Sequence, residues 1–137
     1  MRRRTFIVTG MAGALSSLPM FVRAAPPSAL DTPLAGSIYY TKDKPGRWAD
    51  LADSHAPQVE SDDGLIMVTT LHEMTMQHHI IKHTLFDGNM SLLGETLFDP
   101  QTKSAAVSQY QIKDYKGVAY VVSMCNLHDC WVTRFMI

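Results

Sequence analysis

The chain has 137 residues, of which 46% are hydrophobic and 18% are charged, and its formal net charge is −1. This length corresponds to one domain, which can bury a core without disulfide bonds. Outside the first 24 residues the chain has no basic cluster, so we expect neither nucleic acid nor an anionic membrane surface as a partner, and no stable membrane insertion.

The first 24 residues have the pattern of a secretory signal peptide. Arg2 to Arg4 form a basic start, Ile7 to Phe21 an apolar region, and Val22-Arg23-Ala24 a small-residue cleavage site. Arg3-Arg4-Thr5-Phe6-Ile7 also looks like a twin-arginine signal, a bacterial address for proteins exported in the folded state. An ordinary export signal with a chance arginine pair is the alternative. Both predict an exported, periplasmic protein, and removal of the signal would change the net charge to about −5.

Three segments precede the first predicted long strand. Ala25 to Thr32 is rich in proline and small residues, Ser37 to Thr41 is a short β-prone piece, and residues 42–46 are turn formers. We therefore expect a flexible N-terminal leader over residues 25–44 and a folded domain over residues 45–137.

The rest of the chain reads as short β-strands. Six β-prone runs are separated by turn signals such as Asp87-Gly88-Asn89. They cover Leu65–Thr70, His78–Phe86, Ser91–Phe98, Ala105–Ile112, Val118–Met124 and Trp131–Ile137. Within the second run, Ile80, Thr84 and Phe86 should share one face, and Ile81, His83 and Leu85 the other. There is no repeat and no long amphipathic helix, so the fold class is all-β, an antiparallel β-sandwich.

The segment from Thr70 to Leu85 has a second interpretation. On a helix, His79 and His83 would lie one turn apart and could form a metal-binding pair. The segment lacks the HExxH motif, however, because Met76 stands where its second histidine would be. The isoleucines, Thr84 and Phe86 favour a strand.

Cys125-Asn126-Leu127-His128 is the motif that indicates chemistry. Cysteine and histidine are both good ligands for transition metals, and a turn at Asn126 would let Cys125 and His128 reach one ion. The alternative is a buried cysteine beside an unrelated surface histidine. Cys130 follows closely, so a Cys125–Cys130 disulfide also remains open in an oxidising compartment.

With the upstream histidines, this pattern resembles the superoxide reductase family, which comprises neelaredoxins and the iron centre II domain of desulfoferrodoxins. The family's C-terminal motif is Cys-Asn-x-His, and here Trp131 follows it closely. Two family histidines six residues apart match His72 and His78, and an earlier one matches His55 in Asp53-Ser54-His55-Ala56-Pro57. The resemblance extends from about Pro45 to Ile137.

The resemblance implies an immunoglobulin-like fold and a mononuclear non-haem iron that cycles between Fe2+ and Fe3+. Its four equatorial ligands would be His55, His72, His78 and His128, and its axial ligand would be the Cys125 thiolate. The substrate would be superoxide, reduced to hydrogen peroxide with electrons from an external donor such as a rubredoxin-like or other small redox protein. Homo-oligomer formation is left open. His79 and His83 match no ligand, so we expect them to pack or lie at the surface.

The sequence departs from the family pattern at several positions. Asp53 and Ser54 stand where the family often has glutamate, which can occupy the sixth iron position, and lysine, which attracts the anionic substrate. Asp53 is a shorter candidate for that sixth position, and Lys82 or Lys44 would have to supply the charge. Glu73 replaces a proline after His72, and Gln77 replaces a glutamate before His78.

Two other function classes remain open at the level of sequence. One is a non-catalytic module that holds iron or zinc, because nitrogen and sulfur ligands also suit zinc. The other is an immunoglobulin-like carrier or adhesion domain whose histidines are incidental. Bound metal and an open coordination position would distinguish the reductase from both.

Overall fold

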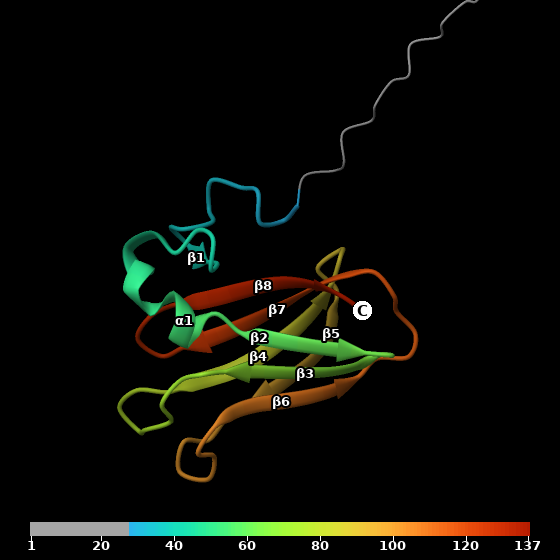
Figure 1. The fold of residues 1–137 in the computed structure, drawn as a ribbon. Coiled ribbons are helices and arrows are strands. Elements are labelled where there is room, and N and C mark those ends of the chain that lie inside the picture. Colours follow the sequence, from blue (N-terminus) through green and yellow to red (C-terminus); the bar gives the residue numbers. More distant parts are fainter. Residues whose placement is uncertain (1–27) are drawn as a thin grey trace, which may run out of the picture.

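The computed structural model describes residues 28–137, so the predicted signal peptide and the first residues of the predicted leader lie outside the described part. Figure 1 shows the arrangement of the elements along this part of the chain. In chain order they are β1 (Tyr39–Tyr40), the 3₁₀ helix η1 (Gly46–Leu51), α1 (Ala52–His55), β2 (Gln58–Asp62), β3 (Leu65–Thr70), β4 (Ile80–Asp87), β5 (Leu92–Leu97), β6 (Ala106–Gln111), β7 (Val118–Cys125) and β8 (Cys130–Met136).

The strands form two sheets that pack face to face. One has the order β1-β8-β7-β4-β5 and the other the order β2-β3-β6. All pairings are antiparallel except that of the short β1 with β8. The prediction of an all-β, immunoglobulin-like antiparallel sandwich is confirmed (Figure 1).

Alternating side chains from both sheets build the core. Every second residue is buried along β6, and β3 buries Ile66 and Val68 in the same way. These two side chains meet Leu85 of β4 and Val121 of β7 in one cluster. This period of two is what a strand with one face on a core requires. The alternation along β3 and β6 therefore places one face of this sheet on the core.

A bulge near the start of β4 changes the predicted alternation. Ile80 pairs with Cys125 and Lys82 pairs with Met124, so one extra residue lies between the two pairs. Because a bulge shifts the side-chain register by one, Ile80 is buried in the core together with His83 and Leu85. The predicted faces hold from Lys82 onward and are wrong at Ile80.

Three features were not in the prediction. The strand β2 has the mostly polar sequence QVESD and lies at a sheet edge, so apolar periodicity does not mark it. The helices η1 and α1 are too short to produce a periodic pattern. The packed region also begins before Pro45, because Tyr40 of β1 is only 1% exposed and contacts Trp131 in the core.

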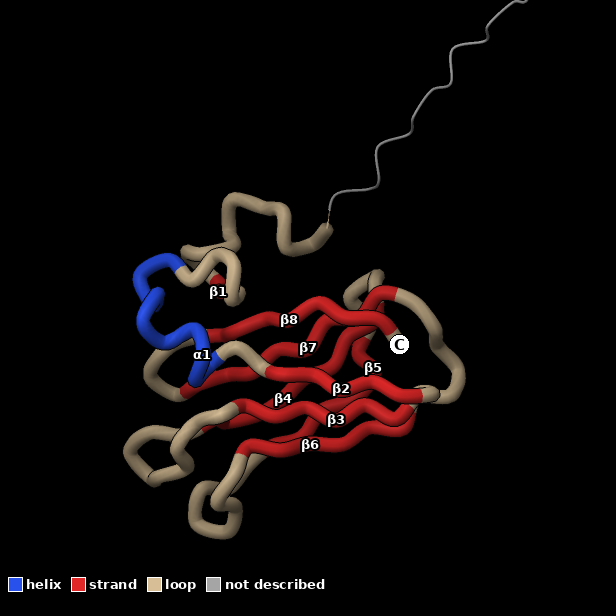
Figure 2. Tube along the Cα trace, in the orientation of Figure 1, coloured by secondary structure: helices blue, strands red, loops and turns tan. Residues whose placement is uncertain are grey.

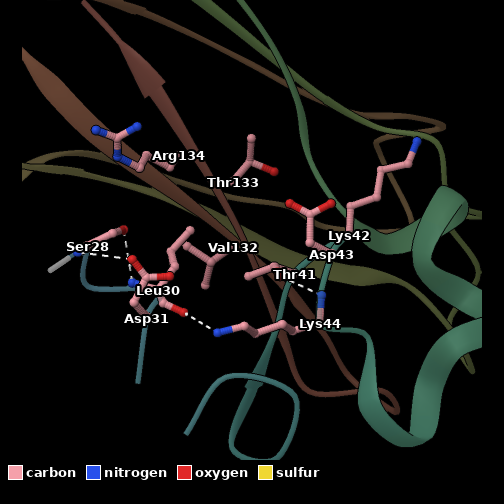
Figure 3. A pocket seen from close by; sticks show the side chains of 10 residues that line it. All are labelled: Ser28, Leu30, Asp31, Thr41, Lys42, Asp43, Lys44, Val132, Thr133 and Arg134. Atoms are coloured by element: carbon pink, nitrogen blue, oxygen red, sulfur yellow. Dashed lines mark hydrogen bonds between the residues drawn. The ribbon is translucent and has the colours of Figure 1, made fainter. Parts of the chain in front are cut away.

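The connections that carry the candidate ligands gather at one end of the sandwich. Figure 2 shows α1, the loop between β3 and β4, and the turn between β7 and β8 at this end. A polar pocket lies elsewhere, between the segment around Lys42 and Lys44 and the strand β8 (Figure 3). Its charged side chains have both signs and none of the predicted ligands lines it, so it is not the predicted site. Neither helix of the described residues has the length and apolar character that a membrane crossing requires.

Candidate metal centre

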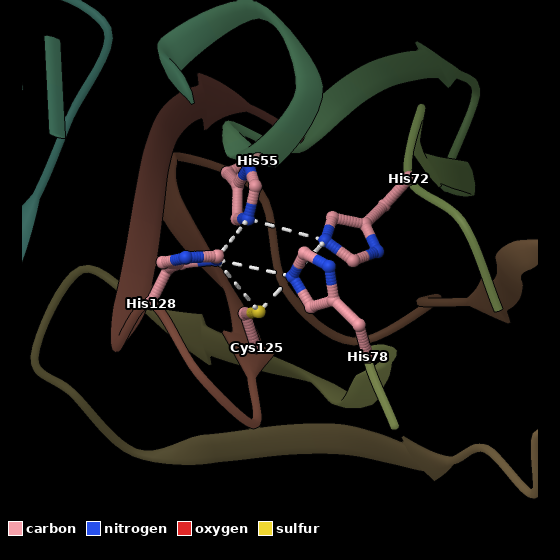
Figure 4. A group of neighbouring side chains, drawn as sticks. All are labelled: His55, His72, His78, Cys125 and His128. Carbon is pink, nitrogen blue, oxygen red and sulfur yellow. Dashed lines mark hydrogen bonds between the residues drawn. The ribbon is translucent and has the colours of Figure 1, made fainter. Parts of the chain in front are cut away.

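Five side chains from four segments meet at this end of the sandwich. His55 is the last residue of α1, His72 and His78 lie in the β3–β4 loop, Cys125 ends β7, and His128 lies in the following turn. One potential ligand atom from each residue lies within 4.8 Å of all the others (Figure 4). The structure thus brings together all five residues that the sequence singled out, and their role as metal ligands stays a prediction.

The four imidazoles point one nitrogen each toward a common centre. His55 Nε2 lies 3.1 Å from His72 Nε2, which lies 3.0 Å from His78 Nε2. His128 Nδ1 completes the circuit at 3.1 Å from His78 Nε2 and 3.0 Å from His55 Nε2. With no two of these atoms more than 4.8 Å apart, the four nearly equal sides approximate a square. The corners of a square of this size lie about 2.2 Å from its centre, close to the distance at which imidazole binds a first-row metal ion.

The Cys125 sulfur lies above this square. It is 3.8 Å from His72 Nε2 and 3.6 Å from His128 Nδ1, which are opposite corners. A sulfur almost equally far from two opposite corners, and within 4.8 Å of the other two, cannot lie in the plane of the square without colliding with a corner nitrogen. The five atoms therefore form a square pyramid with the sulfur at its apex, and none of the five residues occupies the opposite face.

The outer nitrogens of three histidines hold the protons. His72 Nδ1 donates to the carbonyl oxygen of Glu73, and His78 Nδ1 donates to the Glu73 carboxylate at 2.7 Å. His55 Nδ1 lies 2.8 Å from Ser54 Oγ and 3.2 Å from the Leu51 carbonyl oxygen. Carbonyl and carboxylate oxygens only accept, so these Nδ1 atoms carry hydrogen and the inward Nε2 atoms keep their lone pairs. That tautomer is the one a metal ligand needs.

Burial keeps three of the four rings uncharged in the absence of an ion. It lowers the pKa of His55 to about 4, with a further contribution from the nearby His72 and His128 rings. Burial also lowers the pKa of His72 and of His128, so these rings are neutral at pH 7. Burial raises the pKa of the Cys125 thiol. The backbone N–H groups of Leu127 and His128 lower this pKa, but by less than burial raises it. A bound cation reverses this effect on a thiol, because coordination favours the thiolate.

Asn126 fixes the two ligand-bearing loops against each other. Its side-chain oxygen accepts from the His79 backbone N–H at 3.0 Å, and its amide group donates to the Gln77 carbonyl at 3.0 Å. Its own backbone N–H donates to the His79 carbonyl at 3.1 Å. These bonds reach Gln77 and His79, the two neighbours of His78 in the sequence, and so join the segment that carries His78 to the turn after Cys125. The sequence predicts only a turn at Asn126.

A second cluster holds the turn that contains His128. Asp129 has a left-handed backbone with φ of 67°, and its carbonyl oxygen accepts from the Cys125 backbone N–H. Its carboxylate accepts from Arg47 at 2.7 Å and from the Trp48 indole at 2.9 Å. The Trp48 ring then contacts the His128 ring edge-on at 4.8 Å. These contacts, which pattern reading did not reveal, fix the orientation of His128.

The two residues before His55 have roles other than those expected. The Asp53 carboxylate is largely exposed and pairs with Lys42 at 2.9 Å, and it does not join the metal-binding group found in the described residues. The Ser54 hydroxyl donates to the Leu51 carbonyl and contacts His55 Nδ1. Of the two lysines proposed as replacements for the family's lysine, Lys82 pairs with Glu95 and Lys44 donates to the Leu30 carbonyl. Lys42 is the lysine beside this segment.

The two remaining histidines lie outside the centre, as expected. His79 Nδ1 donates to the Thr75 carbonyl and the residue is half-buried. His83 is fully buried between the sheets, where its two nitrogens contact the hydroxyls of Thr70 at 2.9 Å and Ser108 at 2.7 Å. Neither belongs to the group of possible ligands.

The disulfide alternative conflicts with the strand register. Met124 pairs directly with Cys130, and directly paired residues point to the same face of a sheet. Cys125 is the next residue and therefore points to the opposite face. Both cysteines are free, and Cys130 lines an apolar pocket beside Met90 and Val122. Cys125 is thus available as a ligand.

The donor set fits a mononuclear transition-metal ion. Four imidazole nitrogens and one thiol sulfur are ligands that iron, zinc and copper accept. Structural zinc sites are almost always tetrahedral with four ligands, whereas five donors in a square pyramid suit an ion that retains a sixth position.

Comparison with known proteins agrees with the geometry. The desulfoferrodoxin family profile matches residues 48–134, the stretch that contains all five clustered residues. No curated protein matches the chain.

Among solved structures, a variant of superoxide reductase (neelaredoxin) from Ignicoccus hospitalis is 26% identical, with a TM-score of 0.62, and covers 74% of this chain and 94% of its own. Superoxide reductase (1Fe-SOR) from Giardia intestinalis is 23% identical with a TM-score of 0.57, covers 62% of this chain and 99% of its own, and supports the fold alone. The profile covers well over half of the sequence, and the chain belongs to the desulfoferrodoxin family.

Proposed function

We propose that this protein is a superoxide reductase that acts at a mononuclear non-haem iron. The observation that carries the proposal is the square of four imidazole nitrogens with the Cys125 sulfur above it, an arrangement in which none of these five residues occupies the opposite face. The structural relative from Ignicoccus hospitalis, which bears the name superoxide reductase, supports the same reading.

Iron bound by the five residues would supply one electron, cycling between Fe2+ and Fe3+, so that superoxide with this electron and two protons gives one molecule of hydrogen peroxide. Imidazole is an uncharged ligand, so four of them would leave much of the positive charge of the ion uncompensated, and this charge would attract a small anion. The Cys125 thiolate and the nearby Glu73 carboxylate would offset part of it. The thiolate would donate electron density to the iron, as a thiolate does to haem iron.

The burial of the five clustered residues determines from which side substrate and protons can reach the centre. His55 and Cys125 are 2% and 4% exposed, so the protein shields the centre on their side. His72, His78 and His128 are only partly buried, which leaves a path for a small substrate and for protons from solvent. The proton-bearing Nδ1 atoms of His72 and His78 are engaged by Glu73, so these rings stay oriented while substrate enters and product leaves.

Two further parts of the proposal rest on the sequence. The centre holds one electron at a time, so an external one-electron donor of the small redox protein class must return the iron to the ferrous state. The predicted export signal in residues 1–24 supports a periplasmic location, and its twin-arginine pattern supports export after the metal has been acquired in the cytoplasm.

The test is a stopped-flow experiment under anaerobic conditions. Protein folded with iron available should contain about one iron per chain, and a pulse of superoxide onto the ferrous form should yield hydrogen peroxide in equal amount. Sustained consumption of superoxide without any donor, with dioxygen formed in half the yield, would identify a dismutase instead. Protein that takes up zinc alone, and gives no coloured form on oxidation, would favour the non-catalytic metal module.

A further inference from the structure

Glu73 contacts the outer nitrogens of two clustered histidines at once. Its carbonyl oxygen accepts from His72 Nδ1, and its carboxylate accepts from His78 Nδ1 at 2.7 Å. The neighbouring turn gives the second contact its geometry, because the Thr75 hydroxyl accepts from the His78 backbone N–H and donates to the His78 carbonyl, both at 3.0 Å. The Glu73 carboxylate therefore reaches across a fixed turn to the His78 ring.

The partners of the four histidines differ in charge. The His55 ring meets a hydroxyl and a carbonyl, and the His72 ring meets a carbonyl, all of which are neutral. The His128 ring is held by the edge of Trp48. Among the described residues, His78 is the clustered histidine whose ring nitrogen bonds a carboxylate. A carboxylate on the outer N–H of a ligating imidazole orients the ring and increases its basicity.

We propose that Glu73 is a positioning residue that tunes the metal centre through His78. The carboxylate holds the ring so that Nε2 points at the centre of the square, and its negative charge strengthens His78 as a donor. A stronger donor, with an added negative charge nearby, stabilises the more highly charged ion, so Glu73 lowers the reduction potential of the bound metal. This inference rests on the proposed metal site.

The exposure of Glu73 separates this role from a role in folding. The Glu73 side chain is 56% exposed, and its carboxylate contact belongs to the loop rather than to the core. Exposed ion pairs contribute little to stability, so substitutions here should leave the fold intact. Loss of metal affinity in a folded variant would then report on the centre itself.

The test compares Glu73→Ala and Glu73→Gln with a matched control, Glu60→Gln, at an exposed carboxylate on β2. Affinity for Co2+ is measured by competition with a chelator, and the reduction potential of the iron form is measured by redox titration. We expect Glu73→Ala to bind Co2+ about 10- to 100-fold more weakly than the parent. Glu73→Gln, which keeps an acceptor and loses the charge, should lose less affinity and raise the potential. Glu73→Asp should recover part of the parental potential, and Glu60→Gln should match the parent.

Three outcomes would contradict the inference in distinguishable ways. If Glu73→Ala and Glu73→Gln keep the parental affinity and potential while His78→Ala loses Co2+, the metal site stands and Glu73 does not tune it. If His78→Ala also binds Co2+ like the parent, His78 is not a ligand, and the proposed centre fails together with the role of Glu73. A uniform loss of affinity in Glu60→Gln as well would show a general charge effect rather than a positioning role.

Discussion

The position of one proton on each ring decides whether the four imidazoles can act together. Carbonyl and carboxylate oxygens hold hydrogen on Nδ1 of His55, His72 and His78, so the lone pairs of their Nε2 atoms converge. Converging lone pairs about 3 Å apart repel one another unless a cation lies between them. His128 uses the other nitrogen, Nδ1, because it approaches from the turn that follows Cys125. The arrangement is thus built for an ion even though each contact alone resembles a hydrogen bond.

The two cysteines should respond differently to substitution. Cys125→Ser removes the apical sulfur, so we expect loss of the long-wavelength absorption that a ferric thiolate gives and loss of most superoxide reduction. Cys130→Ser should keep both properties, because its side chain points away from the centre, and should cost at most about 1 kcal/mol of stability. Visible spectra of the oxidised proteins and thiol counts on the denatured, metal-free protein are the measurements.

The thiol count also tests the disulfide alternative. Two free thiols agree with the register, in which Cys125 and Cys130 lie on opposite faces. A count of zero under anaerobic conditions would mean that the thiolate is not available and that the proposed mechanism is wrong.

Substitutions of the two members of the Lys42–Asp53 ion pair should have opposite effects on the rate of reaction with superoxide. Asp53 lies two residues before His55, and the Lys42 ammonium neutralises its charge at 2.9 Å. Lys42→Gln should leave a bare carboxylate near the centre and lower the second-order rate with superoxide roughly two- to threefold at low salt, whereas Asp53→Asn should raise it by a similar factor. Both effects should shrink at high ionic strength, because salt screens exposed charges.

Stopped-flow rates at two salt concentrations make this comparison. Lys103→Gln, in the exposed loop between β5 and β6, is the matched control and should keep the parental rate. Equal rates for Lys42→Gln and Asp53→Asn at low salt would show that this pair does not influence the approach of the anion.

Sequence reasoning identified the residues of the centre but not what holds them. The ligand types and the Cys125–His128 spacing are visible in the sequence, and the resemblance to a family supplied the other three histidines. Glu73 was visible only as a departure from a family pattern. Its contact with His78 depends on the turn around Thr75, which periodicity does not describe. The same holds for Ser54 and Asn126, whose roles follow from loop geometry.

At the level of elements, a buried polar network ties the two sheets together next to the centre. His83 of β4 contacts Thr70 of β3 and Ser108 of β6, and the Thr70 hydroxyl lies 2.9 Å from Ser123 of β7. Thr70 lies two residues before His72, and Ser123 lies two residues before Cys125. The network therefore joins the strand ends from which two of the clustered residues project. In the described residues, every buried side-chain nitrogen and oxygen has a hydrogen-bond partner.

His83 should make the stability of the protein depend on pH. Burial lowers its pKa to about 4, below the ordinary histidine value of 6.5, so between these values the unfolded chain binds a proton that the folded protein excludes. The contribution to stability is complete above about pH 6.5 and is lost as the pH falls toward 4, by up to roughly 3 kcal/mol. Urea unfolding at pH 7 and pH 4.5 should show a smaller loss in His83→Gln than in the parent. Parallel losses in the two proteins would contradict this account, because the other titrating groups are the same in both.

The range of a strand could be predicted from the sequence where the strand packs one face on the core. A strand with no buried face gave no such signal. β3 and β6 alternate between buried and more exposed residues, β7 is buried or half-buried throughout, and the predicted ranges of all three match the structure closely. β2 has four exposed residues out of five and carries no such signal. The bulge in β4 depends on pairing with β7 around Cys125, a long-range contact that a local pattern does not contain. Its effect is to bury Ile80 beside Cys125, beneath the centre.

At the scale of the whole molecule, the centre is a cross-link between distant parts of the chain. The clustered residues extend from His55 to His128 in the sequence and come from α1, the loop that joins β3 of one sheet to β4 of the other, the end of β7 and the turn after it. The backbone pairings that build each sheet do not involve the five clustered side chains, so the sandwich can form before the metal binds. The ion should then stabilise the folded state by mass action, because the unfolded chain does not hold the square of nitrogens together.

Metal removal should therefore lower the melting temperature, and the loss should depend on the clustered residues alone. An ion present at about 100 times its dissociation constant stabilises a protein by about 2.7 kcal/mol, which corresponds to a shift on the order of 10 °C for a domain of this size. Calorimetry with and without a chelator should show this shift in the parent and in His79→Ala, whose half-buried ring lies outside the cluster. His78→Ala should start from a lower melting temperature and lose little more on chelation, because the site is already broken. If the parent melts at the same temperature with and without chelator, the nitrogens are held by the sandwich itself and the cross-link contributes nothing to stability.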